Sequence, residues 1–184
     1  AIVDGRSRLT WAQAKEWTDR VALGLMELGI NRDDVMVIQL PNWVEYFLLR
    51  LACQKAGITY LPVQRTFRQQ EMQYILGYVE ASALAIPWQF GGRDYYEMAQ
   101  EVLPNLPRLK HILIVGDTTP PGTVSVSQLS QRPIDRNYVA SLVKERAHNV
   151  MDIMLSITSG STGFPKFVEQ PFGAWLGHIH AYIQ

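Results

Sequence analysis

The sequence is short of cysteine, of long apolar runs and of any excess of one charge. Cys53 is the one cysteine among 184 residues, which excludes an internal disulfide framework. It lies in the apolar run 48–53, which favours a buried and inert thiol. No segment reaches the roughly 18 apolar residues of a membrane span, and the first residues do not resemble a signal peptide. We therefore expect a cytoplasmic protein without a membrane span.

Charge of either sign is balanced in this chain. Lysine and arginine together number 17, as do aspartate and glutamate, so the formal net charge is zero. No basic stripe with interleaved aromatic residues occurs, so a nucleic-acid or anionic-membrane partner is not expected. Hydrophobic residues make up 47% of the chain and charged residues 18%, which is the balance of an ordinary globular domain.

An initiator methionine is also absent. The chain begins at Ala1 inside an apolar stretch and ends at Gln184 inside an expected helix. Such ends are typical of a piece cut from a longer protein, and we expect the chain to be one.

Apolar runs alternate along the chain with stretches of helical periodicity. This alternation predicts βαβ units and an α/β fold, with a layered, largely parallel sheet flanked by helices. No internal repeat or interdomain linker occurs, so we expect one domain over residues 1–184. The alternative is that the last ~30 residues begin a second structural unit. The expected strands are 1–3, 8–9, 35–38, 58–63, 83–86, 111–115, 152–156 and 166–169; the expected helices are 11–28, 43–56, 67–79, 95–103, 138–146 and 173–184; residues 117–125 are expected to form an exposed loop.

Three of the expected helices begin with a capping residue. Thr10 with Gln13, and Asn42 with Glu45, have the spacing of a capping box. Thr66 is the expected N-cap of the 67–79 helix.

Residues 156–166 read Ser-Ile-Thr-Ser-Gly-Ser-Thr-Gly-Phe-Pro-Lys and follow the apolar run 153–155. We expect a strand that opens into a loop. Gly160 and Gly163 permit positive φ and close backbone approach. The hydroxyls and free N–H groups supply hydrogen-bond donors, and Lys166 adds a positive charge. This combination indicates a polyphosphate ligand.

The loop is not a Walker A motif. That motif needs Gly-Lys-Ser/Thr at the start of a helix, whereas Gly163 is followed here by Phe-Pro-Lys. Pro165 and the β-branched Val168 argue against an immediate helix. An ordinary P-loop is therefore excluded.

The loop closely resembles the signature Thr-Ser-Gly-Ser/Thr-Thr-Gly-x-Pro-Lys-Gly of the adenylate-forming enzymes. These are the acyl- and aryl-CoA synthetases, the peptide-synthetase adenylation domains and the luciferases. The matching positions are Thr158, Ser159, Gly160, Ser161, Thr162, Gly163, Pro165 and Lys166. Phe167 stands where the family usually has glycine, which argues against close backbone packing at that point.

The resemblance extends across the chain. The family's N-terminal order is followed by Leu9-Thr10-Trp11, Leu28-Gly29-Ile30, Pro41-Asn42 with Glu45, and Ala56-Gly57 into Leu61-Pro62-Val63. Residues 92–99 and 106–111 are most similar to the aryl-acid ligases related to 2,3-dihydroxybenzoate–AMP ligase. The chain therefore resembles the N-terminal part of the AMP-binding large domain of such an enzyme.

The resemblance implies an ATP-dependent carboxylic acid–AMP ligase. Such an enzyme joins an aryl or acyl acid to AMP, releases pyrophosphate, and passes the acyl group to the thiol of CoA or of a carrier protein's phosphopantetheine. It implies that the loop residues hold the β- and γ-phosphates, that Lys166 acts catalytically by neutralising the departing pyrophosphate, and that Mg²⁺ bridges the phosphates. The loop residues are Thr158, Ser159, Gly160, Ser161, Thr162 and Gly163. No residue of this chain is predicted to ligate a metal.

In the family, the residues that bind adenosine and Mg²⁺ lie further along the chain than position 184. The resemblance therefore implies that this piece has no adenylation activity alone. Two alternatives stay open: a fatty-acyl-CoA synthetase, and a non-catalytic binding module of the same fold.

The remaining candidates have structural interpretations. His178 and His180 are two residues apart and face different sides of a helix, which disfavours a metal pair, and His111 and His148 are expected to be structural. Four tryptophans are expected to be packing aromatics; they are Trp11, Trp17, Trp43 and Trp88. Arg65 and Arg68 are expected at a solvated helix start, with an anion contact as the alternative.

Overall fold

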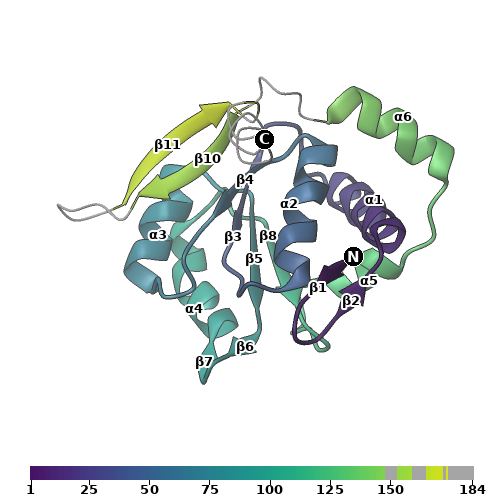
Figure 1. Cartoon of the computed structure of the whole chain (residues 1–184). Helices are drawn as coiled ribbons and strands as arrows, with labels where there is room; N and C mark the ends of the chain where they lie inside the picture. Colours follow the sequence, from purple (N-terminus) through teal and green to yellow (C-terminus); the bar gives the residue numbers. More distant parts are fainter. Residues whose placement is uncertain (148–152, 159–164, 172, 174–184) are drawn as a thin grey trace, which may run out of the picture.

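The computed structural model describes residues 1–147, 153–158, 165–171 and 173, and has a five-stranded parallel sheet at its centre (Figure 1). The strand order is β4-β3-β5-β8-β9, and each neighbouring pair is parallel. The strands are β3 (Val35–Ile38), β4 (Thr59–Pro62), β5 (Ala83–Pro87), β8 (His111–Val115) and β9 (Val124–Ser125). The predicted α/β class with a largely parallel sheet is confirmed.

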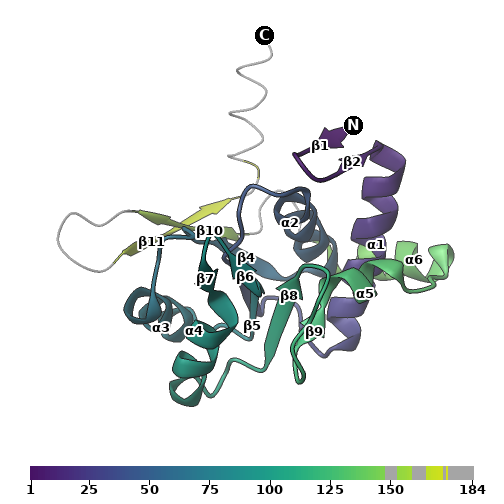
Figure 2. The same ribbon diagram turned by 90° about the horizontal axis from the view of Figure 1, so that it is seen from below.

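Helices cover both faces of this sheet (Figure 2). One face carries α1 (Trp11–Glu27), α2 (Val44–Ala56) and α5 (Val126–Gln131), while the other carries α3 (Gln69–Tyr78), α4 (Tyr95–Val102) and the short 3₁₀ helix η1 (Leu103–Asn105). The next helix, α6 (Arg136–Arg146), lies against α2. No helix in the described ranges is long and apolar enough to cross a membrane.

The sheet is buried on both faces because its strands are apolar at consecutive positions. Met36 and Ile38 pack into the core cluster beneath α1 and α2, whereas Val37 between them packs into the cluster beneath α3 and α4. Leu84 and Ala85 divide between the two clusters in the same way. Because alternate residues enter opposite clusters, consecutive positions of a strand are all apolar, and the strands could be predicted from apolar runs alone.

Three antiparallel hairpins stand outside the central sheet. They are β1 (Ile2–Val3) with β2 (Arg8–Leu9), β6 (Gln89–Phe90) with β7 (Arg93–Asp94), and β10 (Ile153–Thr158) with β11 (Lys166–Pro171). The first and third were predicted. The second was not predicted. Its turn is formed by Gly91 and Gly92 at φ of 59° and 73°.

The capping predictions were right for α1 and wrong for two other helices. Thr10 and Gln13 form the predicted capping box. Helix α2 begins instead after Trp43, and the N–H of Val44 donates to Oδ2 of Asp4 at 2.7 Å. A carboxylate from the β1–β2 turn therefore satisfies the helix start that Asn42 was expected to satisfy.

Helix α3 begins two residues later than the sequence predicted. Its N-cap is Arg68, whose N–H donates to Oε2 of Glu71 at 2.9 Å, so Thr66 lies outside the helix. Glu71 therefore supplies the capping interaction, from within the first turn.

The segment 117–147 is more ordered than its composition indicated. Residues 117–125 were expected to be an exposed loop, but Val124 and Ser125 form β9, and Ser125 is buried. Ser125 also caps α5 by accepting from the N–H of Gln128. Helix α6 begins two residues before the expected start at 138.

Close approach of the α5–α6 segment to α1 and α2 depends on two glycines. A Cβ at Gly24 would lie 2.7 Å from a methyl carbon of Leu129 in α5. A Cβ at Gly57 would overlap the carbonyl oxygen of Arg146 in α6, and the same oxygen accepts a hydrogen bond from Arg32.

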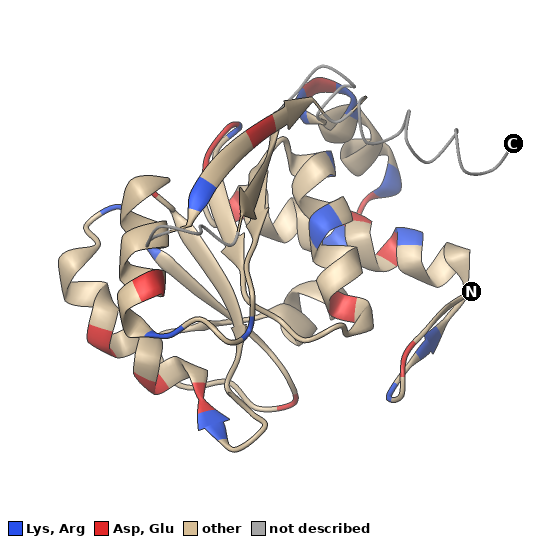
Figure 3. Cartoon of the chain, turned by 60° about the vertical axis from the view of Figure 1, so that its left-hand side comes forward, with Lys and Arg blue, Asp and Glu red and all other residues tan. Residues whose placement is uncertain are grey.

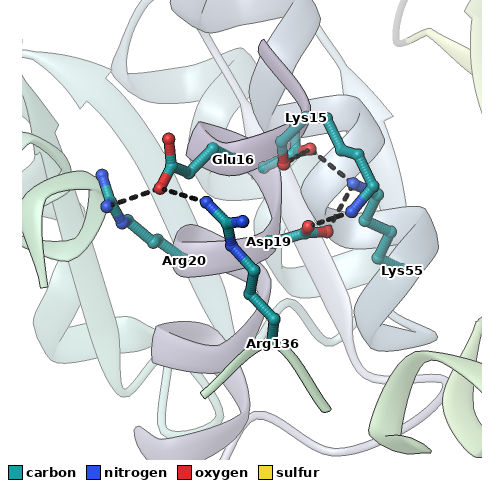
Figure 4. Close-up of polar contacts among 7 residues, drawn as sticks. Lys15, Glu16, Asp19, Arg20, Lys55 and Arg136 are labelled. Carbon is teal, nitrogen blue, oxygen red and sulfur yellow. Dashed lines mark hydrogen bonds and ion pairs between the residues drawn. The ribbon is translucent and has the colours of Figure 1, made fainter. Parts of the chain in front are cut away.

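Polar contacts join the helices on this side of the sheet (Figure 4). Asp19 of α1 accepts from Lys15 at 2.6 Å and from Lys55 of α2 at 2.7 Å. Glu16 is paired with Arg20 at 2.9 Å and with Arg136 of α6 at 3.6 Å. Over the described part of the chain, basic and acidic residues are interspersed rather than gathered by sign (Figure 3).

Three of the four tryptophans expected to be packing aromatics pack against the core. Trp17 and Trp43 are partly buried against one core cluster and Trp88 against the other. Trp11 is 63% exposed, so that prediction was wrong. It is the first residue of α1, at the end of the helix beyond the edge of the core.

Candidate functional site

The motif singled out in the sequence lies on the β10–β11 hairpin, which runs beside the edge strand β4. Six residue pairs form the ladder, from Ile153 opposite Pro171 to Thr158 opposite Lys166. The last pair brings the two ends of the motif together.

Two of the predicted site residues can be placed. Thr158 ends β10 and Lys166 begins β11, and both side chains are exposed. The Thr158 hydroxyl donates to the Lys166 carbonyl over 3.5 Å, a long hydrogen bond. The other predicted site residues lie outside the described residues; they are Ser159, Gly160, Ser161, Thr162 and Gly163. Of the helix expected over residues 173–184, only Gly173 is described, and it is helical.

The other face of the hairpin packs on the protein. Leu155 and Ile157 contact the core cluster of α3 and α4. Phe167 lies opposite Ile157 and contacts the same cluster. Because side chains alternate along a strand, this packing directs Lys166 away from the core. The ammonium group of Lys166 therefore faces solvent at the start of β11.

A second candidate site was missed by the sequence interpretation. A cavity of about 560 Å³ lies at the carboxyl ends of β3 and β4, where α/β sheets commonly bind ligands. Its wall contains the aromatic rings of Trp43 and Phe90, which meet edge to face at 5.3 Å, and Arg65, whose guanidinium lies 5.8 Å from the Phe90 ring. The sequence signal was two polar segments, 41–42 and 64–66, that each follow a strand.

The arginine pair expected at one helix start is divided between two environments. Arg65 lines the cavity just described, whereas Arg68 is the N-cap of α3 and its side chain donates to the Phe67 carbonyl at 3.3 Å. They do not form a joint anion site.

The residues expected to be inert have surroundings that agree with that role. Cys53 is fully buried, and burial raises the pKa of its thiol to about 12, so it stays protonated. Partial burial lowers the pKa of His111, and the charge of Lys110 lowers it further, so this imidazole is neutral at pH 7. Over the described ranges, no group of three His, Cys, Asp or Glu side chains could hold a metal ion. His148, His178 and His180 lie outside these ranges.

Comparison with known proteins extends the resemblance found in the motif. The chain is 31% identical over 169 residues to a salicylyl-CoA synthase / salicylate adenylyltransferase from Streptomyces. The aligned region covers 91% of this chain and 31% of the relative. It is 28% identical over 195 residues to the 2,3-dihydroxybenzoate-AMP ligase of Bacillus subtilis, with 100% of this chain and 34% of the relative covered. The chain thus spans about a third of the length of these relatives.

Solved structures agree on the fold. The apo structure of Mycobacterium smegmatis MbtA superposes with a TM-score of 0.79 at 24% identity, over 94% of this chain and 30% of that one. The model of the AMP-binding enzyme family matches residues 1–182. By this match over nearly its whole length, the chain belongs to the AMP-binding enzyme family of adenylate-forming ligases.

Proposed function

We propose that this chain is the N-terminal, phosphate-binding part of the large domain of an ATP-dependent carboxylic acid–AMP ligase with an aryl acid substrate. The observation that carries the proposal is the hairpin that places Thr158 and Lys166 opposite each other at the two ends of the family motif. The aryl class is supported by the relatives, whose names specify salicylate and 2,3-dihydroxybenzoate.

In the proposed reaction, a carboxylate oxygen of the acid attacks the α-phosphorus of ATP. The new bond joins that oxygen to the phosphorus, and the bond to the bridging oxygen of the β-phosphate breaks. The electron pair leaves with pyrophosphate, so negative charge grows on the departing group. In the second step, the acyl group passes to the thiol of CoA or of a carrier protein, and AMP leaves.

Lys166 is proposed to stabilise the departing pyrophosphate. Its ammonium group is a compact positive charge on a flexible stem, suited to phosphate oxygens. The hairpin base holds its backbone beside Thr158. Positioned charge of this kind is the main source of catalysis when phosphoryl groups are transferred. The hydroxyls and N–H groups of residues 158–163 are proposed to hold the β- and γ-phosphates.

Mg²⁺ is a general partner of ATP, but the described residues do not include an acidic or histidine cluster that fits it. Residues elsewhere in the enzyme are proposed to supply metal ligands and the adenosine pocket.

The proposal is tested by acid-dependent ATP–pyrophosphate exchange with the full-length protein. A panel of hydroxybenzoates, other aryl acids and fatty acids is compared at equal concentration. We expect exchange with an aryl acid. Exchange with fatty acids alone would support the acyl-CoA synthetase alternative, and no exchange with any acid would favour a non-catalytic module.

A further inference from the structure

Phe167, at the position where the family motif usually has glycine, forms the centre of an aromatic cluster. Its ring stacks on the ring of Tyr78 in α3, with centroids 4.4 Å apart and planes within 3° of parallel. Tyr74, one turn earlier in α3, lies 6.0 Å from Phe167 and 5.8 Å from Tyr78. The three rings join the start of β11 to α3.

This cluster is not simply part of the hydrophobic core. Tyr78 is 64% exposed, and Phe167 is only partly buried. Stacked aromatic pairs stabilise beyond the apolar area that they bury and prefer defined geometries, so this contact also restricts the orientation of the Phe167 ring. Phe167 directly follows Lys166, so a restricted Phe167 also restricts the backbone of Lys166.

The strand geometry connects the two residues. Lys166 and Thr158 form the terminal pair of a two-stranded ladder, and Phe167 and Ile157 form the pair next to it. A two-stranded ladder is marginally stable by itself in water, so the end next to the connecting loop frays unless side chains hold it. Ile157 and Phe167 are the side chains nearest that end that pack on the α3–α4 cluster.

We propose that Phe167, through its stack on Tyr78, is a positioning residue that holds the backbone of Lys166 where its ammonium group meets the phosphates of ATP. The inference rests on the proposed function, because it assigns Phe167 an effect that acts through Lys166. Glycine at this position has no ring and could not make this contact.

The experiment is a double-mutant cycle in the full-length protein, read by ATP–pyrophosphate exchange. Phe167→Ala and Tyr78→Ala are each expected to lower kcat on the order of 10-fold, with a smaller change in KM for ATP, because a misplaced catalytic group costs rate. Phe167→Tyr, which keeps the stack, is expected to retain the wild-type kcat. Tyr138→Ala removes another exposed ring, on α6, and serves as the matched control.

The decisive arm repeats Phe167→Ala and Tyr78→Ala in a Lys166→Ala background. If the aromatic contact acts through Lys166, both substitutions lose most of their effect there. Effects of equal size in both backgrounds would show a merely structural contact and overturn the inference. A wild-type protein without any exchange would instead overturn the proposed function.

Amide hydrogen exchange gives a readout that needs no activity. The amides of residues 166–168 are expected to exchange faster in Tyr78→Ala than in Tyr138→Ala, because the loop end of the ladder frays. Equal rates in the two variants would contradict the anchoring on which the inference depends.

Discussion

Lys166 is exposed at the start of β11, opposite Thr158, and its proposed role depends on its charge. A charge-assisted phosphate contact contributes about 1.5–3 kcal/mol, which converts to a rate effect of roughly 10–100-fold. We expect Lys166→Ala in the full-length enzyme to slow acid-dependent ATP–pyrophosphate exchange by this factor. Lys144→Ala, at an exposed position of α6, is the matched control. An unchanged exchange rate in Lys166→Ala would remove the proposed role.

Asp4 caps a helix that begins 40 residues further along the chain. Its Oδ2 accepts from the N–H of Val44, and its Oδ1 accepts from the N–H groups of Arg6 and Ser7, each at 2.7 Å. Loss of a helix cap costs about 1–2 kcal/mol. We therefore expect Asp4→Ala to lower the free energy of unfolding by that amount, measured by urea denaturation.

Asn42→Ala is the control for this prediction, because Asn42 has the local sequence signature of the cap without filling the role. We expect it to change the free energy of unfolding by less than about 0.5 kcal/mol. Equal effects of the two substitutions would contradict the assignment of Asp4 as the capping residue.

At the scale of elements, Asp19 of α1 joins this helix to α2 through its ion pair with Lys55. Burial alone would raise the pKa of this carboxyl, but the hydrogen bonds from Lys15 and Lys55 outweigh burial and the pKa is lowered. A group with a lowered folded-state pKa stabilises the fold above its unfolded pKa and loses that contribution as pH falls through the folded pKa. The ion pairs of Asp19 therefore stabilise the fold at neutral pH and lose this contribution in acid.

We expect Asp19→Asn to lower the free energy of unfolding by about 1–3 kcal/mol at pH 7. The difference from wild type should be complete above about pH 4, the pKa of aspartate in the unfolded chain, and should shrink as the pH falls from there through the lowered folded-state pKa. Urea denaturation across this range measures it. Glu16→Gln, at the more exposed pairs with Arg20 and Arg136, is the control and should cost less than about 1 kcal/mol. A pH-independent difference for Asp19→Asn would exclude the ionic origin.

Gly57 ends α2 in the left-handed region, at φ of 72°, beneath the Arg146 carbonyl of α6. Gly29 follows α1 at φ of 80° with open space around it. Alanine at Gly29 meets only the conformational cost, about 1 kcal/mol. Alanine at Gly57 meets that cost and also displaces α6, so we expect a larger loss of stability, by at least another 1 kcal/mol or so. Thermal unfolding of the two variants measures the difference, and equal losses would show that α6 does not depend on this approach.

The whole molecule contains the sheet and the motif hairpin, while the family relatives are about three times as long. We expect the chain expressed alone to show no acid-dependent ATP–pyrophosphate exchange, because the proposed adenosine pocket is supplied elsewhere in the enzyme. The same chain with Lys166→Ala sets the background. Exchange by the wild-type chain above this background would show that the described part of the fold is sufficient for adenylation.

Local sequence patterns were reliable for the central strands and for α1. The strands β3, β5 and β8 are continuous apolar runs, because a strand covered by helices on both faces needs an apolar residue at every position. The Thr10 cap was predictable because both partners of its capping box lie within three residues. The family motif was equally evident, since its glycines, hydroxyls and lysine lie in one short segment.

Local patterns failed where the partner of a residue lies far along the chain. The cap of α2 comes from Asp4, the cavity at the ends of β3 and β4 brings Arg65 to Phe90, and β9 forms because β8 offers it an edge. None of these partners occurs in the sequence window that a local pattern uses.

The sequence by itself thus determined the fold class and the family, because burial and the family motif constrain residue type at neighbouring positions. Only the tertiary structure decided that Thr158 faces Lys166, that Arg146 closes over Gly57 and that Phe167 stacks on Tyr78. The physical reason is that these contacts join separate elements, so their energies depend on how the elements pack and not on residue type alone.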